Sequence, residues 1–365
     1  MTYKDIFGKI VQVRKMINRT KKVFDGINAD ALVVEQEDLR FYLTGFASSF
    51  GIVICDNNSA RFYTDSRYIE AAQKTLEGSG ITVEEYPRGT ALFDLLSGYK
   101  VVAMPLDRVS ANEYNALINK GFTIVDATSA FENAMSIKDE GEIENIKLAC
   151  QVTDRAFLEL LPLIKEGMTE NEVAALLEFL MRKHGASGVS FETICAFGAN
   201  ASVPHHETGK TVLKFGDPIL IDFGCKINGY SSDCTRTFLF GDDGKHADFK
   251  KTYDKVLTAH MLVKEKFTEG MTGCQGDAIA RDYLKKYDLA KYFTHSLGHS
   301  LGINIHESPS LSPKDNNVFK NGMVFSDEPG VYIAGQLGIR IEDTVTLSGG
   351  KVLSLTNSDK NLIIL

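Results

Sequence analysis

The chain has few cysteines and no long apolar run. Its six cysteines are scattered, with no CxxC pair and no framework spacing, so we expect reduced thiols in a cytoplasmic protein. No stretch approaches the roughly 18 apolar residues that a membrane span requires. The N-terminal segment mixes charges into its apolar positions, unlike the apolar core of a signal peptide. These absences predict a cytoplasmic protein with no membrane partner.

Basic residues are also in the minority, with 40 lysines and arginines against 48 aspartates and glutamates and a formal net charge of −8. A nonspecific nucleic-acid surface is therefore not expected, and a peptide or small-molecule partner is favoured. At 365 residues, 44% of them hydrophobic and 24% charged, the chain is typical of a globular protein with two domains or one enlarged domain.

Histidine is absent from the first third of the chain, where short apolar runs alternate with turn residues. Helical stretches at 66–76 and 111–119 separate these runs, so the pattern predicts an α/β domain over residues 1–133. Around residue 136 the spacing of apolar residues changes to that of a long helix. We therefore predict a second domain over residues 134–365.

The second domain contains an internal sequence repeat. The letters EGMT occur at 166–169 and again at 269–272, each between two helical stretches, and Thr169 with Glu172 predicts a capping box at the first of them. Similar offsets of 101 to 109 residues separate three further pairs: His205 and His306, Asp222 and Glu328, Asp233 and Glu342. The spacing predicts two similar halves, each offering carboxylates and a histidine to one central site.

The segment 221–237, IDFGCKINGYSSDCTRT, is the centre of this pattern. Asn228 and Gly229 form the strongest short signal for a tight hairpin, which would bring Asp222 and Asp233 to the same point in space. Two converging carboxylates require a shared proton, a basic partner or a metal ion, and two ordinary aspartates at strand ends remain an alternative.

Histidines cluster further along the chain. Five of the eight fall in two short groups, His205–His206 and His295, His299, His306. The last three could share one side of a helix, but the flanking Gly298 and Gly302 also permit a strand or loop that approaches a ligand closely. The other three histidines are expected at surface positions of helices: His184, His246 and His260.

Two more carboxylates, Glu328 in SDEPG and Glu342 in GIRIED, complete an oxygen-rich set with some nitrogen and no thiolate. Such donors suit Mn²⁺, Fe²⁺, Co²⁺ or Zn²⁺. Four carboxylates carry more charge than one divalent ion needs, so two ions with shared carboxylates fit better. That arrangement activates water for hydrolysis.

The motifs DFGCKINGYSSDCTRTF, HSLGHSLGINIHESP, SDEPGVY and GIRIED, in this order, resemble the signature of the pita-bread metallopeptidases: Xaa-Pro aminopeptidases, prolidases and methionine aminopeptidases. DLRFYLTGF and FYTDSRY resemble the creatinase-like N-terminal domain of the proline-specific members. The resemblance implies an α+β pita-bread domain, with two similar halves around a dinuclear metal site. An α/β creatinase-like domain would precede it, and the protein would be a homodimer.

The resemblance also assigns roles to residues. It implies that two metal ions are held by Asp222, Asp233, His299, Glu328 and Glu342, of which Asp233 and Glu342 are bridges. It further implies that His205, His295 and His306 line the substrate site, that Glu328 exchanges a proton with the attacking water, and that Arg340 braces the carboxylates or a substrate group. His205 is preferred to His206 because it follows Pro204 directly. Asp327 stands where an apolar residue is common and is expected to alter the charge of the pocket.

The sequence thus predicts a metallopeptidase, with Mn²⁺ preferred to Co²⁺, Zn²⁺ or Fe²⁺. Its substrates would be peptides with proline second, from which it removes the N-terminal residue. The alternative is a prolidase, which acts on Xaa-Pro dipeptides. A methionine aminopeptidase is less favoured because those enzymes generally lack the leading domain. A creatinase-like or binding-only protein would generally lack metal ligands that this chain keeps.

Overall fold

A computed structural model describes residues 19–365 of the chain. Most of the N-terminal segment, for which we expected no signal peptide, lies outside this range. The chain divides into two compact units, Met1–Met135 and Ser136–Leu365. Among the described helices, none is both long and apolar enough to cross a bilayer.

The first unit contains a six-stranded sheet of order β4-β3-β2-β1-β5-β6. Its strands are β1 (Ala31–Val34), β2 (Ile52–Cys55), β3 (Ala60–Thr64), β4 (Ile81–Glu85), β5 (Val101–Met104) and β6 (Thr123–Asp126). The pairs β1–β5, β5–β6 and β3–β4 are parallel, and the other two are antiparallel.

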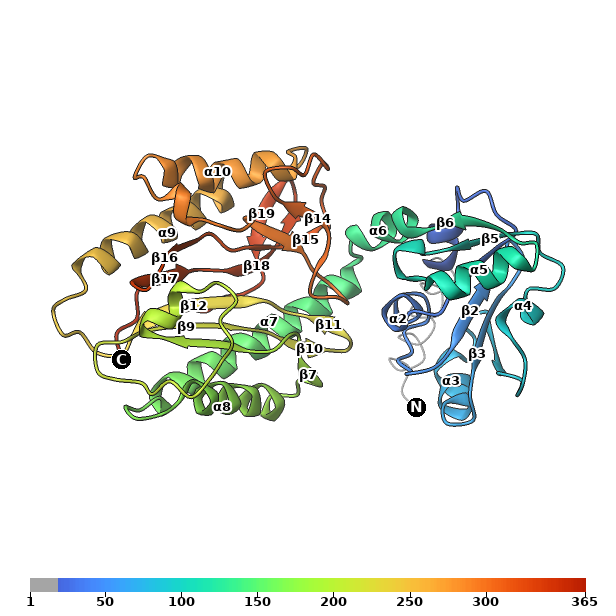
Figure 1. Ribbon diagram of the computed structural model, residues 1–365, viewed down its shortest axis with the longest axis horizontal. Coiled ribbons are helices and arrows are strands. Elements are labelled where there is room, and N and C mark those ends of the chain that lie inside the picture. Colours follow the sequence, from blue (N-terminus) through green and yellow to red (C-terminus); the bar gives the residue numbers. More distant parts are fainter. Residues whose placement is uncertain (1–18) are drawn as a thin grey trace. The chain divides into compact units, whose positions relative to one another are not determined.

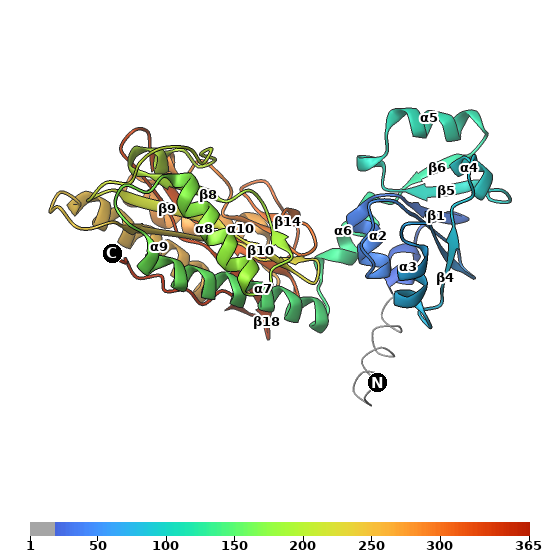
Figure 2. The same ribbon diagram turned by 90° about the horizontal axis from the view of Figure 1, so that it is seen from below.

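Helices lie on both sides of this sheet, with α5 on one side and α2 and α3 on the other (Figure 2). They are α2 (Glu37–Thr44), α3 (Ile69–Leu76), α4 (Leu92–Leu95), α5 (Ala111–Asn119) and α6 (Thr128–Ser136). The helix predicted at 111–119 is observed with those bounds, whereas the one predicted at 66–76 begins three residues later, at Ile69.

The second unit is built of two sets of helices with antiparallel strands between them. The first set is α7 (Glu140–Leu160), α8 (Glu170–Lys183), β7 (Gly188–Val189), β8 (Ile194–Phe197), β9 (Pro218–Phe223), β10 (Cys225–Ile227), β11 (Tyr230–Ser231) and β12 (Cys234–Leu239). The second is α9 (Ala247–Lys266), α10 (Gly273–Lys285), β13 (Gly298–Ser300), β14 (Glu307–Leu311), β15 (Val324–Asp327), β16 (Gly330–Ile333), β17 (Leu337–Arg340), β18 (Asp343–Ser348) and β19 (Lys351–Ser354). In Figure 1, α7 and α8 lie on one side of the strands and α9 and α10 on the other.

The two EGMT segments occupy matching places in the two sets. Leu213 bonds the first segment through its N–H (2.8 Å) and its carbonyl oxygen (3.0 Å), and Phe319 bonds the second segment in the same way, at 2.9 Å for both bonds. In each segment the threonine closes a capping box at the start of the next helix, α8 or α10. The prediction of two similar halves is confirmed.

One prediction about the helices is wrong. His260 was expected at the surface, but its side chain is fully buried. It continues the row Phe249, Tyr253, Val256 and Val263, whose spacing of three and four residues places all five on the buried face of α9. A count of apolar spacings that included His260 would have predicted its burial.

Candidate metal centre

The predicted hairpin brings two aspartates together. Asn228 and Gly229 have positive φ values of 50° and 82°, as a tight turn of this kind requires. The strands on either side of the turn return alongside each other, and β9 pairs with β12 antiparallel. Asp222 lies in β9, and Asp233 directly precedes β12. Carboxylate oxygens of Asp222, Asp233 and Glu342 all lie within 4.8 Å of one another.

The second half supplies His299 and Glu328 to the same place. His299 lies in the short strand β13, so the strand alternative was correct and the helix alternative was not. A Cβ atom at Gly298 would lie 2.0 Å from the carbonyl oxygen of Ser326, and only glycine therefore lets β13 approach β15 this closely. Glu328 follows β15 immediately.

His299 presents a free lone pair to the carboxylates. Its Nδ1 donates to the carbonyl oxygen of Ser300 at 3.1 Å, which leaves Nε2 unprotonated and aimed at the cluster. This Nε2 lies 3.5 Å from Oδ2 of Asp233 and 3.5 Å from Oε1 of Glu328. Burial, together with the charge of His306, lowers the pKa of His299 to about 4, so the ring is neutral at pH 7. A neutral imidazole is the form that binds a metal ion.

The carboxylates need more positive charge than the protein provides. Burial and the neighbouring carboxylates raise the pKa of Asp233 and that of Glu342 well above the usual range. Burial also raises the pKa of Glu328 to about 8. Oδ1 of Asp222 is buried without a hydrogen-bond partner among the described residues. A largely buried cluster of oxygen donors with one neutral imidazole therefore fits divalent ions.

Arg340 is the cation that the chain itself supplies. Its Nη2 donates to Oδ2 of Asp222 at 2.6 Å, and its Nε donates to the hydroxyl of Thr235 at 2.9 Å. The Thr235 hydroxyl in turn donates to Oε2 of Glu342 at 2.6 Å. Arg340 thus sets the orientation of two carboxylates from different halves of the domain.

A second branch of this network reaches His295. Nη1 of Arg340 donates to the Tyr332 hydroxyl at 2.7 Å, and this hydroxyl donates to Nε2 of His295 at 2.9 Å. Nδ1 of His295 donates to the carbonyl oxygen of Ser296 at 2.8 Å, which fixes the tautomer. Neither Thr235 nor Tyr332 was predicted as a site residue. Both lie inside the quoted motifs, DCTRT and EPGVY, but residue type alone does not reveal which side chain in another part of the chain each hydroxyl bonds.

The cluster opens into a cavity of about 450 Å³, within the range of small-ligand sites. The predicted residues that line it are Asp222, Asp233, His205, His295, His299, His306, Glu328, Arg340 and Glu342. The ring of His306 lies 4.4 Å from that of His299, measured between centroids.

Two choices made from the sequence can be compared with this cavity. His205 lines it, whereas Nε2 of His206 turns away to Oε2 of Glu170, at 3.0 Å. Asp327 does not line it, but its charge acts on the pocket from behind, since it helps to raise the pKa of Glu328. The side chain of Asp327 is fully buried against His260, because the next residue along the extended chain, Glu328, takes the cavity side.

Comparison with known families agrees with this architecture. Residues 144–348 match the model of metallopeptidase family M24, and residues 16–134 match the creatinase/prolidase N-terminal domain. The first match alone covers more than half of the chain, so the predicted fold class, a pita-bread domain after a creatinase-like domain, is confirmed. Membership of this family implies divalent metal ions.

Three relatives span almost the full length. An Xaa-Pro dipeptidase of Pyrococcus horikoshii is 33% identical over 95% of this chain and 99% of its own. The structure of an Xaa-Pro dipeptidase from Bacillus anthracis has a TM-score of 0.90 and 33% identity, covering 97% of this chain and 100% of that one. An X-Pro aminopeptidase structure from Thermotoga maritima has a TM-score of 0.87 and 32% identity, covering 94% and 100%. The chain belongs to metallopeptidase family M24.

Proposed function

We propose that this protein is an Xaa-Pro aminopeptidase, which removes the N-terminal residue of peptides with proline in second place. The observation that carries the proposal is the convergence of four carboxylates and one neutral histidine on a single cavity. In this proposal the holders of two divalent ions, Mn²⁺ in the first instance, are Asp222, Asp233, His299, Glu328 and Glu342. When bound, the ions supply Lewis acidity and a hydroxide near neutral pH.

Glu328 is the group that handles protons. Its pKa is raised to about 8, chiefly by burial, while the charge of Arg340 opposes the rise and that of Asp222 adds to it. This pKa is that of the metal-free site; bound divalent ions would lower it, so that Glu328 would be ionised in the active enzyme and able to accept a proton, as general acid–base catalysis requires. Glu328 therefore accepts the proton of the attacking water and delivers it to the leaving nitrogen.

His295 is assigned to the substrate carbonyl. Burial and the charge of Arg340 lower the pKa of His295 to about 3, so its ring is neutral. Tyr332 and Ser296 hold the ring from two sides, and the lost mobility is an advantage for orienting a reacting group. Both ring nitrogens of His295 are engaged in these bonds, so His295 shapes the wall beside the substrate carbonyl, and the donors to that carbonyl are His205 and His306, which are exposed on the cavity wall.

The apolar part of the cavity suits a proline ring. Phe191, Ile194, Pro204 and Ile305 line it beside the charged cluster. An Xaa-Pro bond is a tertiary amide with a fixed φ at proline and no N–H, so its cleavage requires an apolar wall for the ring and no acceptor for a substrate N–H. The apolar lining therefore supports a preference for proline at the second position of the substrate.

We also propose that the protein is cytoplasmic and forms a homodimer, with the domain boundary at 133/134. All six cysteines are free, and five of them are buried, which supports a reducing compartment. The dimer follows from the family resemblance and is testable by light scattering of the purified protein.

The discriminating experiment compares kcat/KM for Ala-Pro-Ala, Ala-Pro and Met-Ala-Ser with manganese-reconstituted enzyme. We expect Ala-Pro-Ala to be cleaved fastest and Met-Ala-Ser hardly at all. Activity confined to Ala-Pro would make the protein a prolidase. Rapid turnover of Met-Ala-Ser would refute proline specificity.

A further inference from the structure

Two aspartates lie behind the metal centre and take no part in it. Asp327 and Asp343 are directly opposite each other in the β15–β18 pair, and both are fully buried. Their sequence neighbours Glu328 and Glu342 line the cavity, whereas they do not. Successive residues of an extended chain point to opposite faces, so each aspartate marks the back of a strand end whose front carries a proposed metal ligand.

His260 of α9 lies between the two aspartates. Its Nδ1 is 3.0 Å from Oδ2 of Asp327 and 3.2 Å from the main-chain oxygen of the same residue. Its Nε2 is 3.5 Å from Oδ2 of Asp343. Burial alone would lower the pKa of His260, but the two carboxylates outweigh it and raise the pKa to about 9. The ring is therefore charged at neutral pH and offers a proton on each side.

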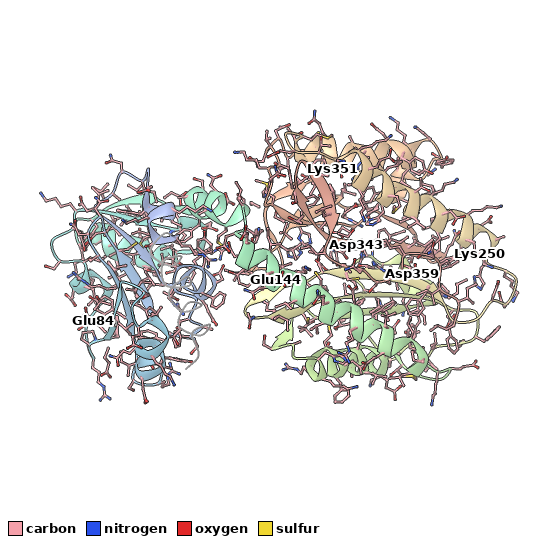
Figure 3. All side chains as sticks on the ribbon, turned by 180° about the vertical axis from the view of Figure 1, so that it is seen from behind. Glu84, Glu144, Lys250, Asp343, Lys351 and Asp359 are labelled. Carbon is pink, nitrogen blue, oxygen red and sulfur yellow. The ribbon has the colours of Figure 1, made fainter. Side chains whose placement is uncertain are left out.

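The two aspartates depend on His260 to different degrees. Asp343 also accepts from Nη2 of Arg236 at 2.8 Å and is 2.9 Å from Nζ of Lys360. Figure 3 shows Asp343 in the interior of the second unit, near Asp359, whose main-chain oxygen accepts from the same arginine. For Asp327, His260 is the one cationic partner within ion-pair distance in the described part of the chain. Like charges opposite each other in a sheet repel, and His260 offsets that repulsion here.

We propose that His260 is a positioning residue of the metal centre: it ties the backs of β15 and β18 together so that Glu328 and Glu342 face the same ions. This inference rests on the proposed ligand set. His260 touches neither ligand and acts through the aspartates that adjoin them. Groups that hydrogen-bond a metal ligand typically contribute 10- to 100-fold to metal affinity, and we expect an effect of that order from His260 acting through the two strand ends.

The test is Mn²⁺ binding to metal-free protein, measured by titration calorimetry for wild type and for His260→Gln. We expect the variant to bind about 10- to 100-fold more weakly. At saturating Mn²⁺ its KM for Ala-Pro-Ala should be unchanged, because the substrate-facing side chains are intact. His184→Gln is the control, since His184 follows the last residue of α8 and pairs with Glu159 away from the cavity. It should bind Mn²⁺ as wild type does.

A variant that leaves Asp327 charged and unpaired can fail to fold for that reason alone. The double variant His260→Leu, Asp327→Leu removes the pair together and keeps the site apolar. If it binds Mn²⁺ at least 10-fold more weakly than wild type, positioning is supported. Wild-type affinity in either variant overturns the inference. Failure of the wild type itself to bind Mn²⁺ would instead refute the proposed metal centre.

Discussion

In the metal-free protein, the cluster of carboxylates should hold protons at neutral pH. Burial raises the pKa of Glu328 from its ordinary 4.5 to about 8, and the pKa values of Asp233 and Glu342 are raised as well. Between pH 4.5 and about 8 the folded protein therefore binds more protons at these carboxyls than the unfolded chain does. The unfolding free energy of the metal-free protein should therefore fall as pH rises.

The buried histidines His295 and His299 also contribute between pH 6.5 and 8. They are neutral there in the folded protein, with pKa values lowered to about 3 and 4, whereas in the unfolded chain they are half protonated at pH 6.5 and almost fully neutral at pH 8. This contribution is the same in wild type and in a Glu328 variant and cancels in the difference. One retained proton corresponds to about 1.4 kcal/mol per pH unit, so Glu328 alone should lower the unfolding free energy by about 2 kcal/mol across the window. Glu328→Gln removes this carboxyl and should flatten the decline by that amount.

The measurement is urea unfolding of metal-free wild type and Glu328→Gln at several pH values between 6.5 and 8. His260, whose raised pKa gives a similar slope, is present in both proteins and cancels in the difference. Glu144→Gln is the control, because Glu144 is an exposed residue of α7 that pairs with Lys147. Calorimetry in buffers of different ionisation enthalpy should show that Mn²⁺ binding at pH 7 releases about one proton fewer from the Gln variant. Equal pH slopes in wild type and Glu328→Gln would refute the reasoning.

Four further substitutions test individual contacts. Tyr332→Phe removes the hydroxyl that joins Arg340 to His295. Because bonds to charged groups contribute about 1.5–3 kcal/mol, kcat/KM should fall roughly 10- to 100-fold with unchanged metal content. Steady-state kinetics and elemental analysis check this. His206→Ala removes one hydrogen-bond partner of the buried Glu170 and should lower the unfolding free energy by about 1–3 kcal/mol without loss of kcat. His205→Ala should instead lower kcat/KM with little change in thermal stability. The reverse pattern would show that the two histidines were assigned wrongly. Gly298→Ala should destabilise the fold by at least about 1–3 kcal/mol, because the new Cβ would overlap the main-chain oxygen of Ser326 in the neighbouring strand β15. A melting temperature equal to that of wild type would contradict the close approach of the two strands.

The sequence predicted those features that depend on local chemistry. Asn228 and Gly229 specify a turn by their tolerance of positive φ, and Thr169 specifies a helix start by its side-chain bond. These two inferences require no knowledge of how distant segments pack. Which side chains meet in the cavity was implied instead by the resemblance of the quoted motifs to the pita-bread metallopeptidases.

Contacts between distant segments were harder to foresee. Thr235 bonds Glu342 across 107 positions, and nothing in its own surroundings indicates that partner. His260 was placed at a surface position of a helix, although its spacing matched the buried row. Asp327 was singled out because an apolar residue is common at that position, and the sequence did not indicate that it lies behind the cavity wall. In each case the side of the strand or helix decided the outcome, and tertiary packing sets that side.

The most direct test of the account is the metal content of the purified chain after removal of metal and reconstitution with Mn²⁺. We predict close to two ions per chain in wild type and a clear loss in Glu342→Ala, which removes a carboxylate proposed to be shared by both ions. His306→Ala, which changes a cavity wall rather than a ligand, should retain both ions. Full peptidase activity in metal-free protein, or equal metal loss in the two variants, would contradict the account.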